Sequence, residues 1–300
     1  MNLPNPFILD GGLSNEIEAL GCDLNHPLWT AKCIEEDPNK VVQVHLNYLN
    51  AGANCIATMS YQASIPGLIK HGYSKNEAKA IIQKSVDLAV QAREVFKEKT
   101  KDTKDTIIAA SIGPYGAYLA DGSEYNGNYK ISVDELREFH AERLSIFAES
   151  KADLLAFETF PDYNELKVID ELIRKHSKKC WVSFSCKNES KLADGTPLGK
   201  CAELFLNNEN VIAIGANCIA MEWVAQIISN LKTHSGDKRI IIYPNGGGYF
   251  DSEEKVWKNP VTGLVFEEEA SKWMAMGASM IGGCCRIGSK DINRLHQCLH

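Results

Sequence analysis

Residues 278–286 read Ala-Ser-Met-Ile-Gly-Gly-Cys-Cys-Arg, an apolar run that ends in two glycines and two adjacent cysteines. The part Ala278–Cys284 predicts a short buried strand, and the glycines allow the chain to turn at its end. Seven further runs of this kind recur along the chain, at Phe7–Gly12, Cys55–Tyr61, Thr106–Pro114, Leu154–Phe160, Cys180–Cys186, Val211–Cys218 and Arg239–Pro244. The sequence therefore predicts a sheet of buried strands.

Amphipathic stretches with helical spacing lie between these strands, at Lys40–Ala51, Lys75–Lys99, Ser132–Ser150, Tyr163–His176, Glu222–Lys232, Glu267–Met276 and Lys290–Leu299. Regular alternation of strand and helix over 300 residues predicts an α/β protein, a single (β/α)₈ TIM barrel that forms one domain over residues 1–300. A doubly wound open sheet is the alternative. It is disfavoured because no G-x-G-x-x-G motif follows a predicted strand.

Composition and charge restrict the partners that this chain can have. A formal net charge of -7 and a pI near 5.7 argue against nucleic acid, which would require a basic surface. No apolar run is long enough to span a membrane, and the first residues lack the layout of a signal peptide. Ten cysteines then indicate reduced thiols in the cytoplasm. Both a monomer and a dimer fit the sequence.

Cysteines stand at the ends of two predicted strands. Cys218 follows one strand, and the pair Cys284 and Cys285 follows another. In a barrel, the carboxyl ends of all strands meet on one rim, so these three thiols are expected to converge. Three thiolates suit Zn²⁺ with one open position, and an all-sulfur site is better suited to activating a thiol than water. The alternative is three buried cysteines that only fill the core.

Carboxylates also lie at predicted strand ends. Asp10 precedes Gly11 and Gly12, so its side chain could pair with an ammonium while the glycine amides donate hydrogen bonds to a carboxylate. An ordinary Asp-Gly turn is the alternative. Glu158 lies in an apolar run, where a carboxylate needs a cation, either a ligand or a structural ion-pair partner.

Aromatic residues near the same rim form a further group. Trp29, Tyr61 and Tyr115 could present an aromatic surface to a cation such as a sulfonium. The alternative is that they cap the barrel.

Taken together, these motifs resemble the zinc-dependent homocysteine S-methyltransferase family over nearly the whole chain. The resemblance rests on Ile8–Gly12, Ser60–Ala63, Ser111–Ala117, Phe157–Thr159, Gly215–Cys218, Tyr243–Asn245 and Gly282–Arg286. The Tyr-Gln-Ala and Gly-Pro-Tyr-Gly-Ala runs are similar to those of stand-alone members that use S-methylmethionine or S-adenosylmethionine. Betaine- and folate-using relatives read differently there, and no cobalamin-binding module is present.

The resemblance implies a reaction and a set of roles. Zn²⁺ would be bound by Cys218, Cys284 and Cys285, and the zinc-bound homocysteine thiolate would attack the methyl group of a sulfonium donor to give methionine. Asp10 and Glu158 would bind the homocysteine ammonium, and Gly11 and Gly12 its carboxylate. The remaining substrate-binding candidates are Gly283, and for the donor Trp29, Tyr61, Gln62 and Tyr115. Alternatives are a methyltransferase with another thiol or selenol acceptor, and an inactive barrel that binds zinc or an amino acid.

One departure from the family concerns the donor. After Tyr243-Pro244-Asn245 many relatives carry a Ser-Gly-Glu-like run, whereas this chain reads Gly246-Gly247-Gly248-Tyr249. The missing acidic residue bears on donor preference, and three glycines indicate a mobile loop.

Overall fold

The computed structural model describes residues 3–101, 106–247, 249–251, 256–258 and 264–300. Eight parallel strands form one sheet in the order β1-β12-β9-β8-β5-β4-β3-β2. They are β1 (Phe7–Ile8), β2 (Cys55–Ala57), β3 (Ile107–Ile112), β4 (Leu154–Phe160), β5 (Cys180–Phe184), β8 (Val211–Asn217), β9 (Arg239–Tyr243) and β12 (Ala278–Ile281). A parallel bridge between Leu9 and Cys55 joins the two end strands and closes the ring. The prediction of a (β/α)₈ barrel is thus confirmed.

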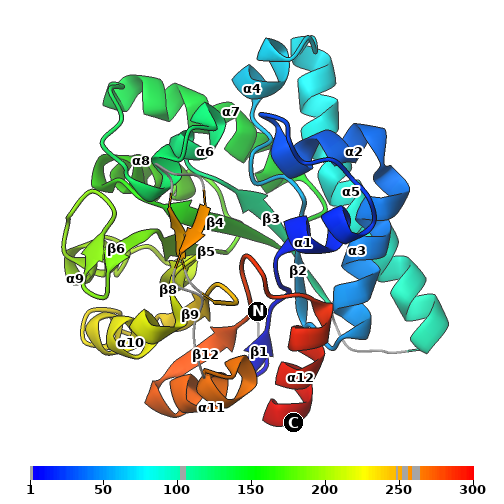
Figure 1. The fold of residues 1–300 in the computed structure, drawn as a ribbon. Helices are drawn as coiled ribbons and strands as arrows, with labels where there is room; N and C mark the ends of the chain where they lie inside the picture. The colour runs from blue at the N-terminus through cyan, green and yellow to red at the C-terminus, as the bar shows by residue number, and fades with distance from the viewer. Residues whose placement is uncertain (1–2, 102–105, 248, 252–255, 259–263) are drawn as a thin grey trace.

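Helices surround the sheet in chain order, as the colours in Figure 1 show. The principal ones are α3 (Pro38–Asn50), α5 (Lys75–Thr100), α7 (Val133–Glu149), α8 (Tyr163–Ile173), α9 (Leu198–Glu203), α10 (Val224–Lys232), α11 (Phe266–Met276) and α12 (Ser289–Leu299). Short helices at the rim are α1 (Leu13–Ala19), α2 (Cys33–Glu36), α4 (Ile65–Lys70) and α6 (Tyr115–Leu119). The sequence did not predict these or α9, because so few turns give little periodicity. Among the described residues, no helix is long and apolar enough to span a bilayer.

Local sequence explains where the long helices begin. At α7, the hydroxyl of Ser132 accepts a hydrogen bond from the Glu135 amide (3.2 Å), and the Glu135 carboxylate accepts one from the Ser132 amide (2.9 Å). Ser74 and Glu77 form the same capping box at α5. Each pair satisfies amides that the first helical turn leaves unpaired.

Both faces of the sheet are buried, which explains why the strands are apolar without alternation. One cluster takes a residue from every barrel strand and fills the barrel interior, where Trp181 donates a hydrogen bond to the Tyr243 hydroxyl (3.2 Å). A larger cluster lies between the sheet and the helices. The strands end earlier than predicted at β1, β2 and β12, since strand pairing gives way there to the turns of the rim.

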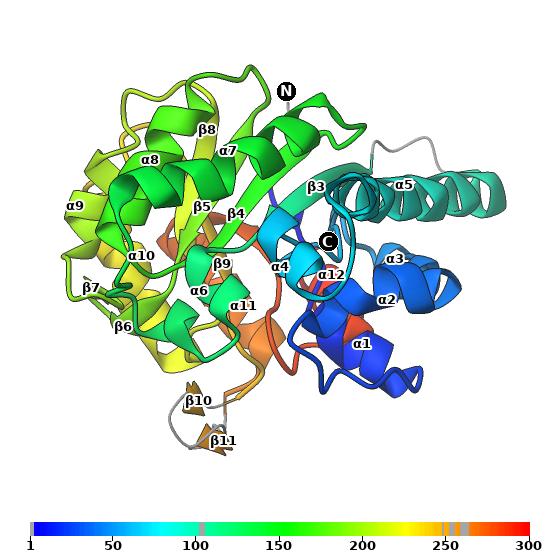
Figure 2. The ribbon, with the colours of Figure 1, turned by 90° about the horizontal axis from the view of Figure 1, so that it is seen from above.

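Two antiparallel hairpins interrupt the barrel pattern. One pairs β6 (Cys186–Asn188) with β7 (Lys191–Leu192), and the other pairs β10 (Tyr249–Asp251) with β11 (Val256–Lys258). Figure 2 shows β10 and β11 standing out beyond the end of the barrel at which α1 and α6 also lie. This is the end to which the carboxyl ends of the strands point.

Candidate active site

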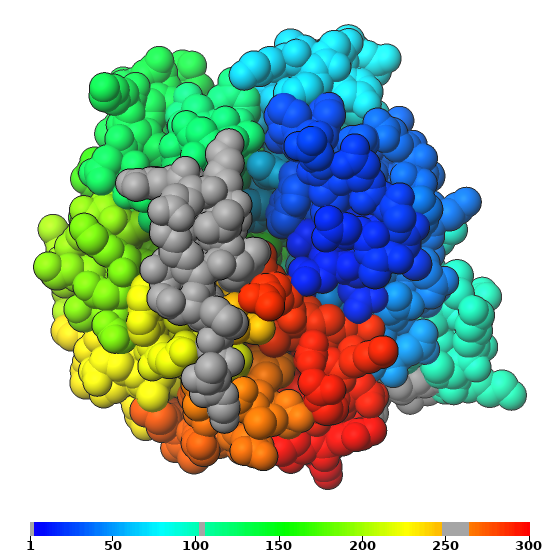
Figure 3. All heavy atoms as spheres, viewed as in Figure 1, coloured from blue at the N-terminus to red at the C-terminus, as the bar shows by residue number. Residues whose placement is uncertain are grey.

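A cavity of about 760 Å³ opens at the carboxyl ends of the strands. Figure 3 shows a hollow in this face beside the blue N-terminal segment. All predicted site residues except Tyr115 line the cavity, namely Asp10, Gly11, Gly12, Trp29, Tyr61, Gln62, Glu158, Cys218, Gly283, Cys284 and Cys285. Residues that are far apart in sequence therefore share one site, as the barrel rim predicts.

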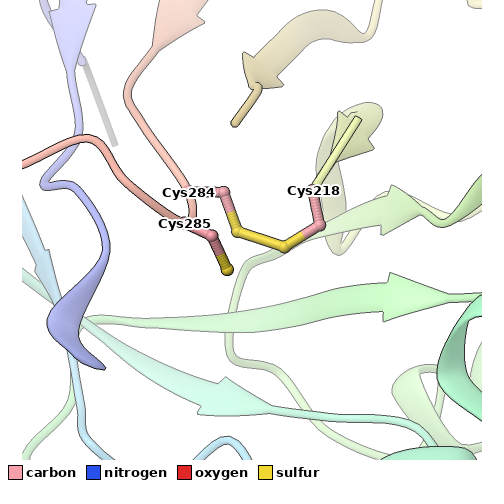
Figure 4. A group of neighbouring side chains, drawn as sticks. All are labelled: Cys218, Cys284 and Cys285. Atoms are coloured by element: carbon pink, nitrogen blue, oxygen red, sulfur yellow. A yellow bond between two sulfur atoms is a disulfide. The ribbon is translucent and has the colours of Figure 1, made fainter. Parts of the chain in front are cut away.

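The three predicted cysteines converge at the edge of this cavity. Cys218 follows β8, Cys284 and Cys285 follow β12, and their Sγ atoms all lie within 4.8 Å of one another. Figure 4 shows Cys218 and Cys284 joined by a disulfide, with the sulfur of Cys285 beside it. The expectation that all cysteines are reduced is wrong for this pair in this structure, because the two strand ends bring the Cα atoms to 5.4 Å, within disulfide range.

Backbone hydrogen bonds fix the turns that carry these cysteines. The Cys218 amide donates to the Tyr243 carbonyl (3.2 Å), the Cys284 amide to the Pro244 carbonyl (2.8 Å), and the Gly246 amide to the Cys285 carbonyl (2.8 Å). The end of β9 thus holds both cysteine turns together. The glycine run that begins at Gly246 is described only as far as Gly247, so the predicted mobile loop lies partly outside the described residues.

Gly283 is required by close packing just before the cysteine pair. A Cβ atom on this residue would lie 2.1 Å from Cγ2 of Ile287, which no real contact allows. Its amide donates to the Asp10 carbonyl (3.0 Å), so the loop after β12 is joined to the loop after β1. The glycine therefore lets two consecutive cysteines turn into the cavity together.

Unusual backbone conformations gather around the same cavity. Seven non-glycine residues in the described part of the chain have positive φ. Five of them line the cavity: Trp29, Ala120, Thr159, Cys218 and Arg286. Such conformations cost of the order of 1 kcal/mol each and persist where the surrounding structure imposes them, often at functional sites.

The Asn217 side chain links two site strands. Its Oδ1 accepts hydrogen bonds from the Thr159 amide (2.8 Å) and the Ser183 hydroxyl (2.6 Å). Its Nδ2 donates to the Thr159 hydroxyl (2.7 Å) and lies 3.9 Å from Sγ of Cys284. Because both ends of the Asn217 amide are engaged, the residue acts as a positioning group. It holds Thr159, the neighbour of Glu158, and it contacts Cys284 of the cysteine cluster directly.

Asp10 and Glu158 form a pair of carboxylates in the cavity wall, the first buried and the second half-buried. Oδ2 of Asp10 accepts a hydrogen bond from the Ala57 amide (2.7 Å), and Glu158 accepts one from the Ser111 hydroxyl. Burial raises the pKa of Asp10 well above its usual value, and the charge of Glu158 raises it further. Burial also raises the pKa of Glu158 to about 7, opposed by hydrogen bonds from Ser111 and Tyr243. A cation between the two carboxylates would relieve this cost.

The two glycines after Asp10 differ in what their amides can bind. The Gly12 amide donates to the Ile287 carbonyl (2.8 Å), so the prediction that it binds a substrate carboxylate is wrong. Gly12 serves instead for close packing, since a Cβ atom there would lie 2.7 Å from the Cys284 carbonyl oxygen. No described residue accepts a hydrogen bond from the Gly11 amide, which remains a candidate.

Aromatic residues form another part of the wall. Trp29 and Tyr61 make an edge-to-face pair, with ring centroids 6.3 Å apart and an interplanar angle of 74°. Tyr115 lies elsewhere: it packs in an aromatic cluster with Tyr118, Tyr129 and Phe139, so its side chain does not reach the cavity. It begins α6, and the helix turns the ring away from the rim.

Sequence reasoning did not identify Glu124 and Tyr125, which also line the cavity. They belong to a short 3-10 helix, Ser123–Tyr125, in the loop after α6. The run Asp-Gly-Ser-Glu-Tyr at 121–125 is typical of a turn, and nothing in it predicts contact with the site. The carboxylates of the lining are those of Asp10, Glu18, Asp121, Glu124 and Glu158. Arg286 is the one lysine or arginine among the described lining residues, so the cavity favours cationic ligands.

Comparisons with known proteins find relatives over nearly the whole chain. A family model described as homocysteine S-methyltransferase matches residues 7–299. The homocysteine S-methyltransferase YbgG of Bacillus subtilis is 42% identical, with 96% of this chain and 93% of that protein covered. A selenocysteine Se-methyltransferase of Brassica oleracea is 39% identical, with 97% and 88% covered.

Solved structures of the homocysteine methyltransferase MmuM from Escherichia coli are also similar. Its metallated form superposes with a TM-score of 0.89 at 37% identity, covering 98% of this chain and 96% of MmuM. Its oxidised form superposes with a TM-score of 0.86 at 38% identity, covering 97% and 95%.

Proposed function

Since the chain belongs to the homocysteine S-methyltransferase family and is an enzyme of that kind, we propose that its methyl donor is a sulfonium, S-methylmethionine or S-adenosylmethionine. The methyl group is transferred to the sulfur of homocysteine, and methionine is formed. One observation carries the proposal: the sulfurs of three cysteines and the carboxylates of Asp10 and Glu158 line one acidic cavity. Once reduced to thiols, the cysteines suit a sulfur substrate, and the carboxylates suit the cationic groups of amino acids.

The cysteine cluster suits a soft metal, for which zinc is the proposed ion. The Sγ atoms of Cys218, Cys284 and Cys285 lie within 4.8 Å of one another. Reduction of the disulfide would make all three available as thiolate ligands, which a soft metal prefers. Zinc held there would act as a Lewis acid that keeps the homocysteine sulfur in its thiolate form at neutral pH. Nδ2 of Asn217 lies 3.9 Å from Sγ of Cys284, so Asn217 would orient the Cys284 sulfur toward the metal by an N–H···S contact.

Homocysteine is held by its amino-acid end in this proposal. The carboxylates of Asp10 and Glu158 bind its ammonium, which offsets the burial that raises the pKa of both groups. The amide of Gly11 donates a hydrogen bond to its carboxylate. These contacts point the sulfur toward the cysteine cluster and fix its direction of attack.

The donor sulfonium lies against the Trp29–Tyr61 pair, whose ring faces attract a cation. The thiolate lone pair forms the new S–CH₃ bond while the old one breaks, and its electron pair passes to the donor sulfur. A cation and an anion thus become two neutral thioethers. Removal of water from the cavity favours this step, because charge disappears as the reaction proceeds.

The acceptor is tested together with the donor. Reduced, zinc-replete protein is incubated with homocysteine and an equimolar mixture of S-methylmethionine, S-adenosylmethionine and betaine, and products are measured by mass spectrometry. We expect methionine at the expense of a sulfonium. Methionine formed from betaine would overturn the donor assignment, and no methionine from any donor would overturn the function in favour of a binding protein.

A selenol acceptor is the second candidate, favoured by the similarity to the Brassica selenocysteine Se-methyltransferase. The same mixture is therefore incubated with selenocysteine in place of homocysteine. A kcat/KM higher for selenocysteine than for homocysteine would make the selenol the principal acceptor.

A further inference from the structure

We propose that Gln62 and Glu124 form a second ammonium site in the cavity, which binds the α-ammonium of the methyl donor. The enzyme would then select donors that are themselves amino acids. This inference rests on the proposed function, because it assigns a place to the second substrate of that reaction. It concerns residues distinct from Asp10 and Glu158, to which the ammonium of homocysteine is assigned.

Gln62 has an unpaired acceptor in the wall of the cavity. The residue is 9% exposed and lines the cavity, and its Nε2 donates to the Ala117 carbonyl oxygen (2.9 Å). Because a carbonyl can only accept, this contact fixes the orientation of the amide and leaves Oε1 as the free end. No described residue donates a hydrogen bond to Oε1, although the atom is buried. A buried acceptor without a donor costs about 1–3 kcal/mol, which a bound N–H group would recover.

Glu124 carries a second unpaired acceptor in the same wall. Its Oε2 is buried and has no hydrogen-bond partner among the described residues, although Glu124 lines the cavity. The 3-10 helix that carries it packs on Gly116, where a Cβ atom would lie 2.4 Å from the Glu124 amide nitrogen. The close backbone contact leaves no room for this helix to move inward. Burial raises the pKa of Glu124 to about 7, so a cation beside it would stabilise the ionised form.

The chemistry of the two acceptors selects among the groups of a sulfonium amino acid. A carboxylate would be repelled by Glu124, and a sulfonium has no N–H with which to satisfy either oxygen. An ammonium has three N–H donors and a positive charge, which suits one amide oxygen and one carboxylate. Tyr61 precedes Gln62 in the chain and pairs with Trp29. The aromatic pair can therefore bind the sulfonium while the next residue along the chain binds the ammonium of the same molecule.

The carboxylates of the two ammonium sites have different charged neighbours. The charged neighbour that raises the pKa of Asp10 is Glu158, whereas the one that raises the pKa of Glu124 is Asp121. The Glu124 amide packs on Gly116, and Gln62 donates to the carbonyl of Ala117, the next residue, so both side chains start from the same part of the wall.

The test compares two ligands that share a dimethylsulfonium and a carboxylate but differ in the ammonium. S-methylmethionine has it, and dimethylsulfoniopropionate does not. Binding of each to reduced, zinc-loaded protein is measured by isothermal titration calorimetry for the wild type, Glu124→Gln and Gln62→Met. We expect Glu124→Gln to weaken S-methylmethionine binding about 10- to 100-fold and Gln62→Met about 3- to 10-fold. Binding of dimethylsulfoniopropionate should change less than about twofold in both.

Glu18→Gln is the matched control, because Glu18 is an exposed carboxylate on the wall of the same cavity. It removes the same charge without a buried acceptor and should leave the affinity ratio of the two ligands unchanged. An equal loss of affinity for both ligands in Glu124→Gln would show a general charge effect and overturn the proposal, as would an unchanged affinity for S-methylmethionine.

Failure of the proposed function would look different. If the wild type binds S-methylmethionine, Glu124→Gln weakens that binding, and no methyl group is transferred, then the ammonium site stands and the activity does not. If the wild type does not bind S-methylmethionine at all, the site is overturned, whatever the enzyme does with other donors.

Discussion

The guanidinium of Arg143 donates a hydrogen bond to the carbonyl oxygen of Gly113 (2.6 Å), linking α7 to the loop that follows β3. Arg143 also donates to the Ala63 carbonyl (3.2 Å) and to Nδ1 of His140 (3.1 Å), and Nε2 of His140 bonds to Glu165 (2.7 Å). Arg143, His140 and Glu165 are all buried, and burial lowers the pKa of His140, so its imidazole is neutral. The imidazole accepts from Arg143 at Nδ1 and donates to Glu165 from Nε2. This network supports the wall that carries Tyr61 and Gln62.

Replacement of Arg143 tests the supporting role of this network. Arg143→Met leaves two buried carbonyls and Nδ1 of His140 without their donor, so we expect the free energy of unfolding to fall by about 3–5 kcal/mol. In the fraction that folds, the KM of the donor should rise more than that of homocysteine, since Ala63 follows Gln62 directly. Urea denaturation and steady-state kinetics measure the two effects. Arg143→Lys keeps the charge but loses the planar set of guanidinium donors. Its free energy of unfolding should lie between those of the wild type and Arg143→Met. A loss below about 1 kcal/mol in Arg143→Met would contradict the role.

Replacement of Cys285 tests the metal assignment. Cys285→Ser in reduced protein should remove stoichiometric zinc and nearly all methyl transfer while the barrel still folds, as circular dichroism and mass spectrometry of the metal would show. Burial raises the pKa of the free Cys285 thiol to about 11, so zinc binding must displace a proton and should weaken as the pH falls. Cys186→Ser removes a thiol outside the cavity and serves as the control. Full zinc content with full activity in Cys285→Ser would disprove the assignment.

Asp10→Asn separates the two substrates. Asparagine can still accept the hydrogen bond from the Ala57 amide, but it lacks the charge that pairs with an ammonium. We expect the KM of homocysteine to rise about 10- to 100-fold and that of the donor to change little. Asp121→Asn, an exposed carboxylate on the same wall, is the control. Equal effects of Asp10→Asn on both KM values would rule out the specific role.

Glu158 predicts a pH dependence with a defined sign. Burial raises its pKa from 4.5 to about 7, so the native state holds a proton that the unfolded chain has already lost. Its contribution to stability is present below pH 4.5 and is lost as the pH rises through about 7. Above pH 7, Glu158→Gln should therefore stabilise the reduced, metal-free protein by roughly 2 to 3 kcal/mol. Denaturant unfolding between pH 5 and 8 measures this, and parallel curves for the two proteins would refute it.

The same titration bears on substrate binding in the opposite direction. Only the ionised carboxylate of Glu158 pairs with an ammonium, so the KM of homocysteine should rise as the pH falls below about 7. The break should be absent in Glu158→Gln. A wild-type profile without a break near this pH would mean that Glu158 does not bind the ammonium as a carboxylate.

Much of the cavity could be predicted from residues at strand ends. Cys218, Glu158 and Asp10 each follow a run of buried apolar residues, and a barrel places all such ends on one rim. The prediction failed where a residue's partner is distant in sequence. Nothing near Gly12 shows that its amide is engaged by Ile287, and nothing near Tyr115 shows that its ring packs on Phe139 of α7.

By itself the sequence determined the barrel, the cysteine cluster and the acidic residues beside it. Apolar periodicity and turn residues act over a few positions, so they can be read without knowing what packs against them. Only the tertiary structure decided which groups are free to bind. In the folded chain the Gly12 amide is hydrogen-bonded to Ile287, and Tyr115 does not line the cavity. Glu124 and Gln62 do line it, and each has one acceptor oxygen without a partner. Hydrogen-bond satisfaction is the physical reason, because it depends on contacts between loops that lie far apart in the chain.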